Sequence, residues 1–115
     1  MMGLQIAVEE IEGVRVLRVE GRLDIANAPI LDRKIDSLID DKHHKFAIDF
    51  SGIDYLSSSG MRVLLSKTKQ LRSQKGDLFL FSVTSEVEDA LKMVGFDRFL
   101  NIYSNEQEAM QGLHK

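Results

Sequence analysis

The chain has 115 residues, the usual size of one domain, and its 43% hydrophobic and 29% charged residues are typical of a globular protein. Its 15 Lys and Arg residues are dispersed among 18 acids and leave a net charge of -3, which argues against nucleic-acid binding through a broad basic surface and against binding a membrane surface. The sequence contains no cysteine, which excludes disulfides, thiolate catalysis and Cys-ligated metal.

The first residues lack the basic region and long apolar run of a secretory signal peptide. No apolar run approaches the roughly 20 residues that are needed to cross a bilayer. We therefore expect one cytoplasmic domain over residues 1–115, without direct membrane insertion.

The N-terminal part of the chain predicts a β-hairpin. Apolar residues alternate with polar or small ones from Leu4 to Val8, a turn follows at residues 10–13, and residues 14–19 form a second apolar run. The alternation slips at Val16-Leu17, which predicts either a strand covered on both faces or a β-bulge.

A helix and a buried strand are expected next. Gly21 ends the second strand, and a loop over residues 24–28 leads to Pro29, which suits the first turn of a helix because that turn tolerates a missing N–H. The apolar residues of this helix fall at helical spacing: Leu31, Ile35 and Leu38. Beyond a polar connection, residues 46–50 predict a short buried strand, and residues 51–60 predict a loop.

The second half of the chain alternates helices and strands. A helix over residues 58–75 presents one apolar stripe, which consists of Met61, Leu64, Leu65, Thr68 and Leu71. A buried strand is predicted at residues 78–81. The next helix is expected to begin with a capping box, Ser85 with Glu88, and to end at Gly95, and its apolar residues are Val87, Leu91 and Val94. A strand at 99–103 and a helix at 105–113 complete the chain.

This order predicts an α/β fold: a mixed, mostly parallel sheet with an N-terminal β-hairpin and about four helices. In such sheets the loops that follow the strands gather at one edge and tend to carry function. Two loops qualify here, residues 22–28 and residues 51–60.

The second of these loops carries the most informative motif of the sequence, Asp49-Phe50-Ser51-Gly52-Ile53-Asp54-Tyr55-Leu56-Ser57-Ser58-Ser59-Gly60-Met61. This segment resembles the signature of STAS-domain anti-sigma-factor antagonists, D-[LF]-S-x-[IV]-x-x-[LM]-D-S-[SA]-G-[LM]. The upstream segment Gly21-Arg22-Leu23-Asp24, with Asn27-Ala28, resembles the G-x-[LI]-D loop of that family. The order of strands and helices matches the family over essentially the whole chain.

The resemblance implies a protein-binding switch without enzymatic activity. Ser58 matches the serine that a kinase-type anti-sigma factor phosphorylates, and a metal-dependent serine phosphatase would reverse this step. The implied partner-binding residues are Asp24, Asn27, Ser57, Ser58, Ser59, Gly60, Met61 and Arg62. One departure is visible, because Ser57 stands where the family usually has Asp. A form that binds its partner without being phosphorylated therefore remains an alternative.

The residues themselves support a site at the serines. A serine run before an amphipathic helix supplies an N-cap, and the helix dipole favours an anion there. Arg62 lies four residues, or about one turn, after Ser58 and could pair with a phosphate. The plainer interpretation is that Ser57, Ser58 and Ser59 only cap the helix.

Other functions find less support. Asp49 could be a phosphoacceptor of the response-regulator kind, but the acids Glu9-Glu10 are expected in the hairpin turn and far from it. Adjacent residues such as His43-His44 point apart on most backbones, so we expect a solvated loop here and not a zinc site. No nucleophile elbow or phosphate-binding glycine loop is present, so we expect no enzyme, cofactor or metal site. A STAS subunit of a transporter or lipid-trafficking complex, or a small-ligand module for nucleotides or lipids, is the alternative.

Overall fold

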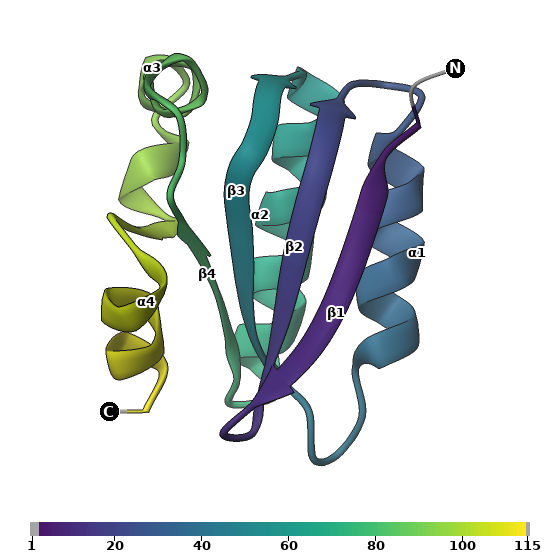
Figure 1. Cartoon of the computed structure of the whole chain (residues 1–115), viewed down its shortest axis with the longest axis vertical. Coiled ribbons are helices and arrows are strands. Elements are labelled where there is room, and N and C mark those ends of the chain that lie inside the picture. Colours follow the sequence, from purple (N-terminus) through teal and green to yellow (C-terminus); the bar gives the residue numbers. More distant parts are fainter. Residues whose placement is uncertain (1–2, 115) are drawn as a thin grey trace.

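A five-stranded sheet forms the centre of the molecule in the computed structural model, which describes residues 3–114 (Figure 1). The strands are Gln5–Ile11 (β1), Val14–Leu23 (β2), Lys45–Leu56 (β3), Asp77–Phe81 (β4) and Asn101–Tyr103 (β5). The helices are Ala28–Leu38 (α1), Ser58–Ser73 (α2), Ser85–Met93 (α3), the short 3-10 helix Phe96–Arg98 (η1) and Glu106–Leu113 (α4). Residues 1, 2 and 115 lie outside the described part of the chain.

The strand order is β1-β2-β3-β4-β5, with β1 and β2 antiparallel and the other neighbouring pairs parallel. This arrangement confirms the predicted mixed, mostly parallel sheet with an N-terminal hairpin. The hairpin turn is shorter than predicted, because β1 continues to Ile11 and only Glu12 and Gly13 remain between the strands. Both have positive φ, 52° and 82°, as a two-residue type I′ turn requires. Glu9 and Glu10 accordingly lie in β1 and not in the turn.

Strand β2 is covered on both faces. Val14 and Val16 belong to a small apolar cluster with α4, whereas Leu17 and Val19 belong to the main core with α1, α2 and α3. The slip at Val16-Leu17 thus reflects burial on both sides. The register shifts of β2 lie further on, between Arg18 and Glu20 and between Gly21 and Arg22.

The prediction of a long loop at residues 51–60 was wrong. Strand β3 runs on to Leu56 and pairs with β2, which itself passes Gly21 and ends at Leu23. The parallel ladder with β2 continues through residues 52–56 and satisfies the backbone of both strands. Gly52 allows this pairing, because a Cβ at this position would lie 2.7 Å from the Glu20 Cγ and 2.8 Å from the Val19 carbonyl oxygen.

Helix α2 packs on the sheet mainly through the predicted stripe. Met61, Leu64, Thr68 and Leu71 are buried, and Leu65 is only half-buried at the edge of this face. The helix ends at Ser73, two residues before the predicted end, and Lys75 adopts a positive φ of 65°.

Lys67 is also buried in α2, which the sequence did not suggest. Its ammonium group lies 2.7 Å from a carboxylate oxygen of Asp32 and also bonds Asp36, both in α1. Burial opposes the charged form of Lys67, but the two carboxylates outweigh it and raise the pKa of this lysine. The ion pairs therefore link α1 to α2 on the outer side of the main core.

Helix α3 begins one residue earlier than the predicted capping box implies. Thr84 is the N-cap, and its hydroxyl accepts a hydrogen bond from the Val87 N–H at 3.4 Å, so Ser85 and Glu88 do not form the box. The helix ends at Met93, and Val94, expected on its apolar face, is 53% exposed. No helix within residues 3–114 is long and apolar enough to cross a membrane.

Candidate functional site

The site expected from the sequence forms at the carboxyl-terminal end of the central strands, where β2 and β3 end side by side (Figure 1). Their last paired residues are Leu23 and Leu56, and the loop to α1 and the first turn of α2 follow directly. The Ser57 N–H donates to the Leu23 carbonyl at 2.9 Å, which joins the two segments. The fold thus joins the two motifs through Leu23 and Ser57, which lie 34 residues apart in the chain.

Ser57 is the N-cap of α2, and its hydroxyl is fully engaged. The oxygen accepts a hydrogen bond from the Gly60 N–H at 3.1 Å, and the hydroxyl donates to the Leu23 carbonyl, also at 3.1 Å. Ser57 has an extended backbone, with φ of -83° and ψ of 168°, as N-cap residues usually do. One hydroxyl therefore both caps the helix and ties it to the end of β2.

Ser58 occupies the first position of α2 and is exposed. Its hydroxyl makes no hydrogen bond to another residue of the described chain, in contrast to that of Ser57. Ser59 is half-buried at the next position. The first-turn N–H groups and the positive end of the helix dipole favour an anionic group beside Ser58.

Gly60 and Met61, expected among the partner-binding residues, are buried under the first turn. A Cβ on Gly60 would lie 2.8 Å from both the Leu23 Cγ and the Leu56 Cδ1, so only glycine allows α2 to approach the strand ends this closely. Met61 is 7% exposed and belongs to the main core. Both residues thus position the exposed serine.

The loop between β2 and α1 is held by its own side chains. A carboxylate oxygen of Asp24 accepts from the Asn27 N–H at 2.9 Å, and the Asn27 amide group donates to the Arg22 carbonyl at 2.8 Å. Asn27 is 9% exposed, so it shapes the loop from within, whereas Asp24 is half-buried. The neighbouring Ile25 is 75% exposed and forms the apolar tip of the loop.

Arg62 is exposed on the first turns of α2 and forms no ion pair with residues 3–114. Its charge is therefore available to an anion near the start of the helix. Sequence reasoning missed a second arginine at this edge, Arg22, whose guanidinium lies 4.2 Å from the ring centre of Tyr55. Tyr55 is 42% exposed. Regular strand alternation would place Tyr55 on the same face as buried Ile53. The register shift of β2 between Gly21 and Arg22 breaks this alternation, so that Asp54 and Tyr55 are both exposed, and the sequence carried no periodic signal for Tyr55.

The alternative sites are occupied by structural contacts. One carboxylate oxygen of Asp49 lies 3.2 Å from Arg18, and the other accepts from the N–H and the hydroxyl of Ser51. The His43 ring contacts Asp40 at 2.9 Å and Glu10 at 2.8 Å, so it is half-buried rather than solvated. Among residues 3–114, no group of three or more His, Cys, Asp or Glu side chains could hold a metal ion.

Comparisons with known proteins agree with the motifs. The family model described as STAS domain matches residues 5–109. The chain is 27% identical over 113 residues to the anti-sigma F factor antagonist of Paenibacillus polymyxa, covering 97% of each protein. A crystal structure of an anti-sigma factor antagonist from Mycobacterium paratuberculosis is similar, with a TM-score of 0.87, 23% identity and coverage of 98% of this chain and 96% of that chain.

The unphosphorylated form of the anti-sigma factor antagonist SpoIIAA is also similar, with a TM-score of 0.81, 20% identity and 96% coverage of each chain. SpoIIAA of Bacillus in its phosphorylated form has a TM-score of 0.70, with 18% identity and coverage of 93% of this chain and 97% of that chain. This chain belongs to the STAS domain family, and its relatives there include anti-sigma factor antagonists.

Proposed function

We propose that this chain is a cytoplasmic anti-sigma-factor antagonist that binds a kinase-type anti-sigma factor and is controlled by phosphorylation of Ser58. The contrast between neighbouring serines carries the proposal. The Ser57 hydroxyl is held by two hydrogen bonds, whereas the Ser58 hydroxyl is exposed and unbonded within the described chain. A kinase could therefore reach Ser58 without disturbing the cap of α2.

The binding surface would consist of the Asp24–Asn27 loop and the start of α2. Ile25 and Tyr55 give this edge exposed apolar groups, and buried aromatic and apolar anchors usually supply most of the affinity of an interface. Binding at this surface would sequester the anti-sigma factor and release the sigma factor.

Phosphorylation would act on the interface and leave the fold intact. The Ser58 oxygen attacks the γ-phosphorus of ATP, ADP leaves, and a base on the kinase accepts the hydroxyl proton. The product carries an added charge of about -1.5 to -2 at neutral pH. The helix dipole and Arg62 would stabilise this charge, while a partner that had accepted a neutral serine would meet it as repulsion and bulk. A metal-dependent serine phosphatase would restore the hydroxyl.

The experiment uses kinase-type anti-sigma factors from the same genome, incubated with the chain and ATP and followed by intact-mass spectrometry. We expect one added phosphoryl group, absent in Ser58→Ala and retained in the matched control Ser59→Ala. Calorimetric titration should show that Ser58→Ala binds like wild type and that Ser58→Glu binds more weakly.

Thermal melts separate the interface from the fold. An acid at this helix position is worth roughly 0.3 to 1 kcal/mol in the stabilising direction, so Ser58→Glu should not melt earlier than wild type. Equal affinity of wild type, Ser58→Ala and Ser58→Glu would contradict the switch. Phosphorylation that persists in Ser58→Ala would assign the modification to another residue.

A further inference from the structure

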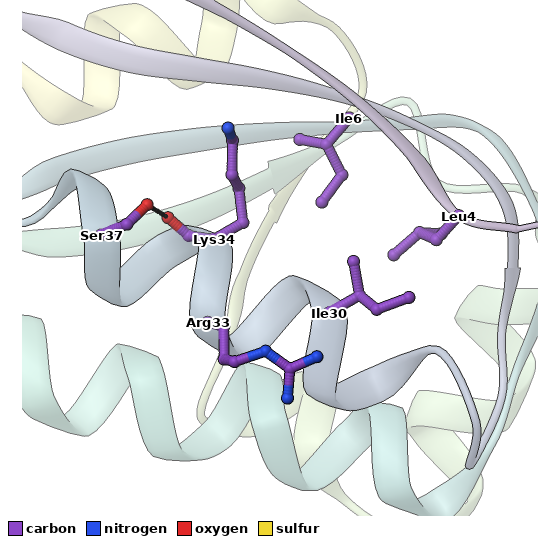
Figure 2. A pocket seen from close by; sticks show the side chains of 6 residues that line it. All are labelled: Leu4, Ile6, Ile30, Arg33, Lys34 and Ser37. Carbon is purple, nitrogen blue, oxygen red and sulfur yellow. Dashed lines mark hydrogen bonds between the residues drawn. The ribbon is translucent and has the colours of Figure 1, made fainter.

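A groove lies between the start of β1 and helix α1, outside the site described above (Figure 2). Its volume is about 410 Å³. Figure 2 shows Leu4 and Ile6 from one side and Ile30 from the other directed into the space between them, which makes the floor apolar. Arg33 and Lys34 stand at successive positions of α1, line the groove and give it a basic rim. In Figure 2 the Lys34 side chain extends to the side of Ile6, and that of Arg33 extends to the other side of the helix.

The two cations of this rim have no ionic partner in the described part of the chain. Neither Arg33 nor Lys34 forms an ion pair with another residue of the described range 3–114. The acids of the same helix, Asp32 and Asp36, bind Lys67 of α2. No acidic residue lines the groove. The groove therefore combines apolar surface with two free positive charges.

One wall of the groove is the edge strand of the sheet, because within residues 3–114 β1 pairs with β2 alone. Ile11 and Val14 flank the type I′ turn, and such a flanking pair exchanges hydrogen bonds. Bonded and non-bonded pairs then alternate along the ladder, so the N–H and C=O groups of Ile6 and Val8 point to the free edge.

The charged side chains of β1 lie near the turn, so the part of the strand beside the groove is not protected against pairing with another strand. Natural edge strands are often protected by charged side chains, and β1 carries Glu9 and Glu10 near the turn. Residues 5–8 carry no charge, and Ile6 among them lines the groove together with Ile30. The unprotected backbone and the apolar, basic groove thus lie together.

We propose that this groove binds an extended segment of a partner protein that adds a strand to β1. The backbone of the segment pairs with Ile6 and Val8. Its side chains on the α1 side are apolar beside Ile30 and acidic beside Arg33 and Lys34. A second copy of this chain fits less well, because it would bring two basic rims toward each other.

The probe is a fluorescein-labelled peptide, Thr-Leu-Thr-Val-Thr-Glu-Thr-Glu, tested beside its reversed sequence because the strand could add in either direction. In a strand, alternate side chains share a face, so its apolar and acidic residues would all turn toward the groove. Fluorescence anisotropy gives the affinity, and amide chemical shifts of the labelled full chain locate the contact. We expect saturable binding of one peptide, with shifts at Ile6, Val8 and Ile30.

Three controls test the chemistry. A peptide with Lys in place of Glu should not bind, and one with N-methylated backbone at alternate positions should lose the strand pairing. The variant Arg33→Glu with Lys34→Glu should weaken binding at least about tenfold, which corresponds to about 1.4 kcal/mol. Lys42→Glu with Arg98→Glu makes the same change in net charge at exposed positions elsewhere and should bind like wild type.

Several outcomes would overturn the proposal. One is equal binding of the Glu and Lys peptides, and another is chemical-shift changes at residues 57–61 instead of β1. A third is a concentration-dependent dimer of the chain that forms through β1. The chain could instead sediment with vesicles of phosphatidylcholine and phosphatidylglycerol and bind no peptide. If Arg33→Glu with Lys34→Glu abolished this sedimentation, the groove would be assigned to lipid. The test is independent of the serine switch, because Ser58→Glu should bind the peptide like wild type.

Discussion

Replacing Ser57 by alanine tests whether this residue is the structural member of the serine cluster. Ser57→Ala removes the cap on the Gly60 N–H and the hydrogen bond to the Leu23 carbonyl. An N-cap is worth about 1 kcal/mol and a neutral hydrogen bond about 1 kcal/mol. The Leu23 carbonyl keeps the Ser57 N–H at 2.9 Å, so no buried acceptor is left without a partner. We expect a loss of about 2 kcal/mol in the free energy of unfolding.

Urea denaturation followed by circular dichroism measures this loss, and a thermal melt should shift by about 8 °C for a domain of this size. Ser58→Ala is the matched control, because the exposed hydroxyl makes no hydrogen bond within residues 3–114, and its effect should stay within about 0.5 kcal/mol. Ser57→Asp keeps the acceptor and loses the donor, so its stability should fall between wild type and Ser57→Ala. Equal losses for Ser57→Ala and Ser58→Ala would refute the division between a structural and an available serine.

Four further predictions concern the core, the ion pairs, the glycine and the interface. Leu64→Ala should destabilise by about 2 to 5 kcal/mol in urea denaturation, and half-buried Leu65→Ala by clearly less; equal losses would contradict the assigned helix face. The two carboxylates that raise the pKa of Lys67 also stabilise the fold. This contribution is fully present below the unfolded-state pKa of about 10.4 and is lost as the pH rises through the folded-state pKa. Between about pH 9 and about pH 12, the free energy of unfolding should therefore fall more for wild type than for Lys67→Met. Parallel pH profiles of the two proteins would exclude this ion-pair contribution. Gly60→Ala should lower the free energy of unfolding by about 1 to 3 kcal/mol, because the added methyl group overpacks the contact with Leu23 and Leu56. An unchanged melting temperature would show that the ends of β2 and β3 shift to accommodate the methyl group. Tyr55→Ala should weaken anti-sigma-factor binding at least about tenfold in titration calorimetry without lowering the melting temperature, whereas unchanged affinity would remove Tyr55 from the interface.

The local sequence determined the elements whose signals are periodic or stereochemical. The apolar spacing of Leu31 and Ile35 predicted α1, and the stripe from Met61 to Leu71 predicted α2, because one face of each helix has to be buried. The serines and Gly60 marked the start of α2, since capping is a short-range interaction between neighbouring residues. The alternation of strands and helices then fixed the mostly parallel sheet.

Only the tertiary structure decided where β3 ends and which serine is free. Residues 51–56 have the composition of a loop, yet pairing with β2 holds them as a strand, and a ladder partner is not visible in local composition. The same holds for Lys67, which is buried because two carboxylates of another helix reach it. The sequence contains three adjacent serines of identical chemistry. Ser57 differs from the other two because its hydroxyl binds the Leu23 carbonyl, which lies 34 residues away in the chain. Ser58 is exposed and Ser59 is half-buried.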